Sequence, residues 1–407
     1  MIYCVCVEIY NTKEGDSMKI AMITWEYPPI MIGGLSVHCK GLAEALVRAG
    51  HEVDVITASH NLTEYENING VNIHRVNPIG HHNFLNWASF MANSMVKKLG
   101  MLGAPSYDII HCHDWMTYFV GTSVKHLLNK PYIQSIHSME YGRCGGIHSE
   151  DSRVINEIEW LSTYESNAVI TVSNSMKHEL CSMFNVPHDK VNVIYNGINP
   201  EEFDIPMDNH EKNEFRKSFG VQPHEKMVLF VGRLVYQKGV EYLIRAFPKI
   251  LEQHPDSKLV IAGAGDMRGY LEELAWNMGY GDKVVFLGFI DGMTLKKLYK
   301  TTDVAVIPSI YEPFGIVALE AMAGGAPVVV SDVGGLSEII QHEYNGVRAY
   351  IKNPDSIAWG VNRILSDEGF RNWIVNNAKH DVYTKYSWDA IAQNTINVYN
   401  ESISKHG

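Results

Sequence analysis

Two glutamates in the second half of the chain, Glu312 and Glu320, are separated by seven residues and flank a predicted helix start. Carboxylates in these positions would accept hydrogen bonds from hydroxyl groups on either side of a bound diphosphate. A plainer alternative makes Glu312 a turn residue and puts Glu320 on a solvated helix face. The neighbours of Glu320 argue against it, because a buried acid needs a partner and four of them are apolar, namely Val317, Leu319, Ala321 and Met322.

The helix start itself predicts an anion site. A buried strand is predicted over residues 304–309 and a helix from Ile316, so the free N–H groups at this end belong to Phe314, Gly315 and Ile316. Unpaired amides and the helix dipole bind phosphate and other oxyanions at such an end. We therefore expect these three residues to contact the phosphates of a bound ligand.

Two cations are predicted at the same edge of the same sheet. Arg233 and Lys238 follow a strand predicted over residues 227–233 and precede a helix predicted over 240–251. Because parallel strands share the edge at which they end, both cations should lie near Glu312. Arg can fork to two oxygens and Lys acts as a point charge, so together they can neutralise a diphosphate leaving group. Loop cations are common, and only their combination with the two glutamates makes the pattern specific.

The elements that must position these residues repeat in both halves of the chain. Predicted strands of the first half cover residues 19–24, 53–58, 71–76, 108–113, 132–137, 168–173 and 191–195. Those of the second half cover residues 227–233, 258–263, 284–289, 304–309 and 328–332, with helices at 240–251 and 269–278. Apolar strands that alternate with helices indicate parallel sheets covered on both faces. The predicted fold is α/β, with two doubly wound Rossmann-like domains facing each other and ligands bound in the interdomain cleft.

The domain boundaries follow from the same pattern. We predict an N-terminal domain over residues 18–203, a C-terminal domain over 204–386, and a helix within 387–407 that packs back on the N-terminal domain. Residues 199–226 are rich in Pro, Asn, Asp and Glu and are predicted to connect the domains. A strand pattern opens directly after Met18, so we expect Met18 to be the natural start and residues 1–17 to be an extension.

Composition limits the classes of partner. The chain of 407 residues carries a formal net charge of -12 and no basic stripe, which argues against nucleic-acid binding. Its six cysteines are scattered without a C-x-x-C pair, which argues against a disulfide scaffold and a zinc module. No apolar run reaches the roughly 20 residues that span a bilayer. We therefore expect a cytoplasmic enzyme that acts on small molecules.

These motifs together resemble the retaining GT-B glycosyltransferases, in particular the glycogen and starch synthase group and related family 4 enzymes. The resemblance rests on Arg233 with Lys238, on Glu312-x7-Glu320, and on three runs of the first half, which are WEYPP at 25–29, Gly33-Gly34-Leu35 and HCHDW at 111–115. It extends from about Met18 to the end of the chain. It implies an acceptor side in the N-terminal domain, a nucleotide-sugar donor side in the C-terminal domain, and transfer of a hexose, with glucose as the favoured sugar, to a glycan.

The resemblance also implies roles for single residues. Gly33 and Gly34 would let backbone amides approach the diphosphate, and His137 would lie beside the transferred sugar. Arg233 and Lys238 would stabilise the leaving diphosphate, and Glu312 would contact sugar hydroxyls with the amides of Phe314, Gly315 and Ile316. Glu320 would bind the ribose, and Asp114 would shape the sugar or acceptor site.

No cofactor other than the nucleotide-sugar co-substrate is expected, and no metal, because the family binds its donor without one and the chain has no D-x-D of the metal-dependent kind. A departure concerns the donor: bacterial glycogen synthases have Lys-x-Gly-Gly-Leu where this chain has Met31-Ile32-Gly33-Gly34. The base therefore stays open among ADP, UDP and GDP, as does the oligomeric state.

Several alternatives remain at this stage. The acceptor could be a lipid or a small molecule, since residues 84–102 form an apolar helical pattern that could dock on a membrane, although ordinary packing is favoured. A GT-B sugar-nucleotide epimerase shares the cleft, but Glu312-x7-Glu320 argues against it. A non-catalytic sensor is disfavoured by the full set of donor residues. His111, His113 and Asp114 could also be metal ligands, although no third set of ligands accompanies them.

Overall fold

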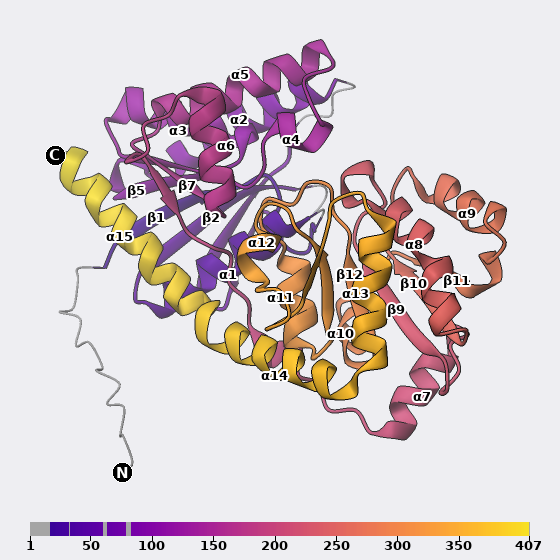
Figure 1. Ribbon diagram of the computed structural model, residues 1–407. Helices are drawn as coiled ribbons and strands as arrows, with labels where there is room; N and C mark the ends of the chain where they lie inside the picture. The colour runs from indigo at the N-terminus through magenta and orange to yellow at the C-terminus, as the bar shows by residue number, and fades with distance from the viewer. Residues whose placement is uncertain (1–16, 32, 60–62, 79–82, 407) are drawn as a thin grey trace.

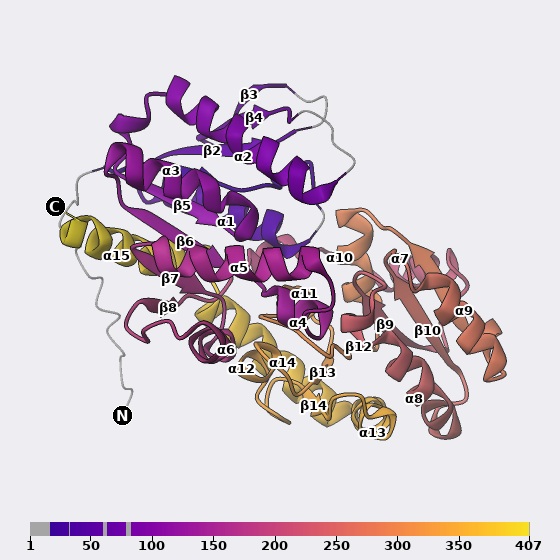
Figure 2. The same ribbon diagram turned by 90° about the horizontal axis from the view of Figure 1, so that it is seen from above.

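The computed structural model describes residues 17–31, 33–59, 63–78 and 83–406. Two α/β domains lie side by side, each built on a twisted sheet with helices on both faces (Figures 1 and 2). The proposed extension at 1–17 falls outside the described residues apart from Ser17. Two parallel-sheet domains confirm the predicted fold class.

The N-terminal sheet has eight strands in the order β3-β4-β2-β1-β5-β6-β7-β8. All neighbours are parallel except β3 and β4, which pair antiparallel. The strands are β1 Lys19–Ile23, β2 Glu52–Ala58, β3 Tyr65–Ile68, β4 Val71–Val76, β5 Ile109–His113, β6 Tyr132–Ile136, β7 Ala168–Thr171 and β8 Val191–Val193. The helices of this domain are α1 Gly34–Arg48, α2 Phe84–Met101, α3 Tyr118–Leu128, α4 Glu140–Cys144, α5 Glu150–Glu165 and α6 Asn174–Phe184.

The C-terminal sheet has six parallel strands in the order β11-β10-β9-β12-β13-β14. They are β9 Lys226–Val231, β10 Ser257–Ala262, β11 Val284–Gly288, β12 Val304–Ile307, β13 Val328–Ser331 and β14 Val347–Ala349. Its helices are α7 Asn209–Lys217, α8 Val240–Gln253, α9 Arg268–Asn277, α10 Gly292–Thr301, α11 Ile316–Ala323, α12 Leu336–Ile339, α13 Pro354–Ser366 and α14 Glu368–Lys385. The central order 10-9-12 brings the loops after β9 and β12 to one edge, as the two cations and Glu312 require.

The structure adds elements to those predicted. Strands β3 and β14 extend the two sheets beyond the predicted strands. The stretch predicted to connect the domains, residues 199–226, also contains helix α7, which was not predicted. Asp208 starts α7 with a capping box, because its side chain accepts from the Glu211 amide while the Glu211 side chain accepts from the Asp208 amide.

The last helix, α15 (Trp388–His406), packs on α1 and runs along the N-terminal domain (Figure 1). Its Trp388 ring fills a space that two glycines leave open: a Cβ on Gly41 would lie 2.1 Å from the ring, and one on Gly197 would lie 2.6 Å from it. Farther along, the Tyr399 hydroxyl lies 2.7 Å from His111 Nδ1. No helix in the described part of the chain is long and apolar enough to cross a membrane.

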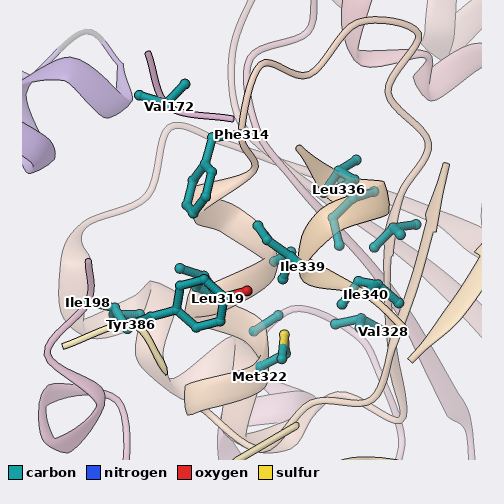
Figure 3. Close-up of a cluster of buried hydrophobic side chains, with 14 of the residues drawn as sticks. Val172, Ile198, Phe314, Leu319, Met322, Val328, Leu336, Ile339, Ile340 and Tyr386 are labelled. Atoms are coloured by element: carbon teal, nitrogen blue, oxygen red, sulfur yellow. The ribbon is translucent and has the colours of Figure 1, made fainter. Parts of the chain in front are cut away.

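One hydrophobic cluster joins the two domains beneath the cleft. Figure 3 shows Phe314 and Leu319 facing Tyr386, with Val172 of the N-terminal domain beside Phe314. Burial of these side chains fixes α11, since Leu319 is fully buried against this cluster. The helix start that carries the predicted anion site is therefore held rigidly by the core under it.

Candidate active site

A cavity of about 380 Å³ lies between the two domains at the carboxyl ends of both sheets. Ten of the predicted site residues line it, namely Gly33, Gly34, Asp114, His137, Arg233, Lys238, Glu312, Phe314, Gly315 and Ile316. Glu320 does not belong to this lining. The structure thus brings the residues predicted from both halves of the sequence to one place.

The C-terminal wall of the cavity carries an ion pair between two of the predicted site residues. Lys238 Nζ lies 2.7 Å from Glu312 Oε2, and the Ser309 hydroxyl donates to the same oxygen at 3.0 Å. Gly239 makes this approach possible: its φ is 63°, and a Cβ there would lie 2.1 Å from the Pro308 carbonyl oxygen. A side chain at position 239 would push Lys238 away from the end of β12.

The start of α11 faces the opposite domain. Gly315, with φ of 111°, precedes the helix, and no side chain caps the first amides. Gly34 lies directly across, because a Cβ on it would come within 3.1 Å of Ile316 Cδ1. The helix end therefore has N–H groups without a side-chain cap, and the space between Gly34 and Lys238 is where the predicted anion would bind.

Glu320 lies one helical turn further along α11. The hydroxyl of Tyr299, on α10, donates to Glu320 Oε2 at 3.3 Å. Burial raises the pKa of Glu320 to about 7, with the Tyr299 hydrogen bond acting against that shift. Glu320 does not line the main cavity, and its predicted contact with a ribose stays a prediction.

Asp114 has an unusual backbone on the N-terminal wall. Its φ of 59° and ψ of 172° lie in a backbone region that residues other than glycine rarely adopt, and this conformation costs about 1–3 kcal/mol. The conformation directs Oδ1 to the His137 amide, which donates to it at 2.8 Å. Burial raises the pKa of Asp114 to about 6, while the Arg143 charge lowers it. Asp114 thus fixes the loop that carries His137.

Four histidines fill the space behind this loop. His113 Nδ1 lies 3.0 Å from His137 Nε2, and His38 Nδ1 lies 2.7 Å from Asn196 Oδ1. His111 instead lies between Ser135 and Tyr399, 2.7 Å from each hydroxyl. Burial lowers the pKa of all four rings, and that of His137 falls to about 3. These rings are therefore neutral at pH 7.

This arrangement changes the metal alternative. His111 is hydrogen-bonded to Ser135 and Tyr399, and Asp114 accepts from the His137 amide. The three residues His111, His113 and Asp114 therefore do not form a metal site, and that hypothesis is wrong. Within the described ranges, the one histidine group whose ring nitrogens converge, within 4.8 Å of one another, is His38, His113 and His137. Two of their nitrogens, His38 Nε2 and His113 Nε2, are buried without a hydrogen-bond partner.

Sequence reasoning missed a second ionic group on the N-terminal wall. Arg143 lies 2.9 Å from Glu140 and 2.8 Å from Glu159, and it donates to both the carbonyl and the hydroxyl of Ser138. This network holds the backbone that follows His137. The sequence gives one hint of this group, which is that Arg143 follows His137 by six residues. It gives no hint of Glu159, because that residue lies on another helix, α5.

Models of two families match the chain, one in each domain. The family 4 glycosyltransferases match residues 32–202, and the group 1 glycosyl transferases match residues 211–381. An uncharacterized glycosyltransferase of Methanocaldococcus jannaschii is 68% identical over 96% of this chain and 100% of its own length. A glycogen synthase of Mycobacterium tuberculosis is 32% identical over 94% of each chain.

Solved structures show the same architecture. The sucrose-phosphate synthase of Thermosynechococcus elongatus has a TM-score of 0.81 at 26% identity, over 95% of this chain and 100% of that one. The catalytic domain of starch synthase IV from Arabidopsis thaliana, bound to ADP and acarbose, has a TM-score of 0.80 at 21% identity, over 95% and 100%.

Proposed function

This chain belongs to the group 1 and family 4 glycosyltransferases, and from that premise we propose that it moves a hexose from a nucleoside-diphosphate sugar to a glycan, with retention at the anomeric carbon. The observation that carries the proposal is the convergence of Lys238, Arg233 and the uncapped start of α11 on one cavity. Two cations and free helix amides are what a leaving diphosphate needs. The presence of ADP in the starch synthase structure supports a nucleotide as the ligand of this wall.

The proposed reaction breaks the bond between the anomeric carbon and the diphosphate while the acceptor oxygen bonds to that carbon from the same face. The proton of the acceptor hydroxyl passes to the departing phosphate oxygen, so the reaction balances without a strong base. Charge stabilisation on the leaving group then carries most of the rate. Lys238 and Arg233 supply it in this proposal, with no metal ion required for the charge balance.

The sugar would lie between the two walls. Glu312, fixed by Lys238 and Ser309, offers a carboxylate to its hydroxyl groups. His137 faces it from the other domain, and the loop of His137 is held by Asp114. Glucose is the proposed sugar because glycogen synthase is among the relatives.

The test begins with a thermal-shift screen of ADP-, UDP- and GDP-glucose, because a ligand that binds the folded state raises its apparent stability. The donor with the largest shift is then offered with maltooligosaccharides, and released nucleoside diphosphate and product linkage are measured. Transfer with an α-linked product supports the proposal. An inverted product contradicts retention, and conversion of a UDP-sugar to an epimer without any acceptor contradicts transfer.

A further inference from the structure

We propose that His38, His113 and His137 bind a zinc ion, or another transition-metal ion that prefers nitrogen ligands, beside the cavity. In this proposal the ion inhibits transfer and is not a cofactor. The site itself stands on the geometry of the three rings, whereas its inhibitory effect rests on the proposed function.

The three rings meet where three elements of the N-terminal domain come together. His38 lies in the first half of α1, His113 is the last residue of β5, and His137 directly follows β6. Strands β5 and β6 are parallel neighbours, so they end at the same edge of the sheet. The centroid of the His137 ring lies 4.5 Å from that of His38 and 5.3 Å from that of His113. One ring nitrogen of each residue lies within 4.8 Å of those of the other two.

This spacing is close to that around a bound zinc ion. Histidine nitrogens bind zinc at about 2.0–2.1 Å in a tetrahedral arrangement, which puts two such nitrogens about 3.3 Å apart. His113 Nδ1 and His137 Nε2 are already 3.0 Å apart. One proton lies between them, because a hydrogen bond between two ring nitrogens needs one donor and one acceptor. An ion in that position takes a lone pair from each nitrogen, and the proton moves to the other nitrogen of the ring that held it.

His38 supplies the third lone pair. Its Nδ1 lies 2.7 Å from Asn196 Oδ1, and an amide oxygen can only accept, so the proton of the neutral ring is on Nδ1. Its Nε2 therefore keeps a free lone pair, and this atom is buried without a hydrogen-bond partner in a residue that is only 3% exposed. A purely structural network leaves that buried acceptor unpaired, which is unfavourable. Metal-binding histidines are held in the same way, with the second ring nitrogen donating to an oxygen.

An ion can reach the site from the cavity. His137 is half-buried and lines the cavity, as does Asn196, whereas His38 and His113 are buried and do not line it. Three protein ligands leave the fourth tetrahedral position open, and a water molecule from the cavity can fill it. Imidazole nitrogens favour zinc, copper, nickel and cobalt over magnesium and calcium, which prefer oxygen ligands. The site therefore discriminates between these two classes of ion.

Occupation of the site opposes glycosyl transfer for an electrostatic reason. In the proposed function the sugar lies beside His137, and its anomeric carbon gains positive charge as the leaving group departs. A divalent cation bound to His137 raises the energy of that charge, and the repulsion is strong where water is scarce. The metal-free protein is therefore the active form.

The first experiment measures metal binding by the full chain without any donor. The chelator-treated protein is titrated with zinc by calorimetry and with cobalt by visible absorption, because tetrahedral cobalt has an intense d–d band. We expect the wild type to bind one more ion per chain than His38→Gln, and the cobalt band to be lost in that variant. The double variant His178→Ala/His188→Ala is the matched control and should keep the band, since it removes two exposed histidines whose ring centroids lie 6.5 Å apart. Equal stoichiometry in the wild type and His38→Gln, or loss of the band in the control alone, would overturn the site.

Folding is kept separate from binding, because His38 is buried. Each variant is first checked by urea denaturation without metal, and His137→Gln, at a half-buried position, takes over if His38→Gln does not fold. X-ray absorption at the zinc edge of the wild type needs no variant, and we expect two or three histidine nitrogens at about 2.0–2.1 Å. A shell of sulfur, or of oxygen with fewer than two histidines, would overturn the proposal.

Asn196 tests the orientation of His38. Asn196→Ala removes the oxygen that holds the proton on Nδ1, and loss of such a partner should weaken zinc binding about 10- to 100-fold. A merely structural role for Asn196 would lower stability and leave the zinc affinity unchanged, and that result would contradict the assignment of His38 as a ligand.

The last experiment measures inhibition. Release of nucleoside diphosphate is followed in a buffer that fixes the free zinc concentration, because the donor also binds zinc. We expect turnover at saturating zinc to fall at least about tenfold, to return when EDTA is added, and to be unaffected by magnesium. Asn196→Ala should need about 10- to 100-fold more zinc for the same inhibition. Full turnover of the zinc-loaded wild type, or equal inhibition of the wild type and the variant, would overturn the inhibitory role.

These outcomes are distinct from failure of the proposed function. If the metal-free protein releases no nucleoside diphosphate with any donor and acceptor, transfer itself is wrong. Metal binding is measured without a donor, so that result would neither support nor remove the three-histidine site.

Discussion

Replacing Lys238 with alanine should lower both stability and turnover, and the two effects can be separated. Lys238 pairs with Glu312 at 2.7 Å, and the two side chains are only 18% and 11% exposed. The variant leaves a nearly buried carboxylate with the Ser309 hydroxyl as its remaining partner. Loss of the pair should therefore cost about 2 kcal/mol of unfolding free energy.

The catalytic effect should be larger and of another origin. A preorganised cation on a leaving group contributes about 3–4 kcal/mol, so turnover should fall roughly 100- to 1000-fold. The double variant Lys238→Ala/Glu312→Gln removes the orphaned charge and should recover more than half of the lost stability. It should recover no activity, because the diphosphate still lacks its cation.

The assay pairs urea denaturation followed by tryptophan fluorescence with nucleoside-diphosphate release at saturating donor. Lys249→Ala is the control, because Lys249 also pairs at 2.7 Å, with Asp355, but the two are 53% and 72% exposed. It should change stability by less than about 0.5 kcal/mol and leave turnover unaltered. Wild-type turnover in Lys238→Ala would refute the diphosphate assignment, and a double variant as unstable as the single one would refute the account of the ion pair.

Three further predictions concern other parts of the structure. Glu320→Ala should weaken donor binding about tenfold with a smaller effect on kcat. An unchanged donor affinity, measured by calorimetry, would contradict the predicted contact between Glu320 and the ribose. Gly41→Ala should destabilise the fold by about 1–3 kcal/mol because a Cβ meets Trp388, whereas Gly100→Ala in α2, with open space around it, should be neutral or stabilising. Burial holds the pKa of His111 well below its usual value. Below about pH 6.5 the unfolded chain therefore binds a proton at His111 that the folded chain does not bind, and the folded state loses stability as the pH falls. His111→Gln should therefore flatten the slope of unfolding free energy between pH 5 and 6 by about 1 kcal/mol per pH unit, and an unchanged slope in denaturation curves would contradict this.

The sequence predicts the central strands because each is a continuous apolar run buried on both faces. The sequence does not predict strand β3, because its residues are mostly polar and mostly exposed at the edge of the sheet. A signal was nevertheless present, since Asn69-Gly70 between two short runs is a strong two-residue hairpin turn. Strand β14 is only three residues long and becomes a strand through its pairing with β13.

The residues of the candidate site also differ in how well the sequence predicts them. Residues directly after a strand, such as Lys238 and Glu312, can be located from the sequence, because topology alone brings strand ends together. Arg143 could not be assigned a role in this way, since its contacts with Ser138 and Glu159 depend on how α4 and α5 pack. The surroundings of His137 were equally hidden, because no periodicity shows that His38 lies beside it.

The contacts that complete the site also close it. A Cβ on Gly142 would lie 2.2 Å from the Tyr311 ring, and the Met139 amide donates to the Tyr311 hydroxyl at 3.3 Å. Nearby, Glu338 of the C-terminal domain accepts hydrogen bonds from the first amides of α6, at 3.0 Å from Asn174 N and 2.8 Å from Ser175 N. These contacts join the C-terminal wall of the cavity to the N-terminal domain. If the proposed function is right, we expect these contacts to part when the nucleotide sugar enters, so that opening and closing of the domains would be a step of the cycle.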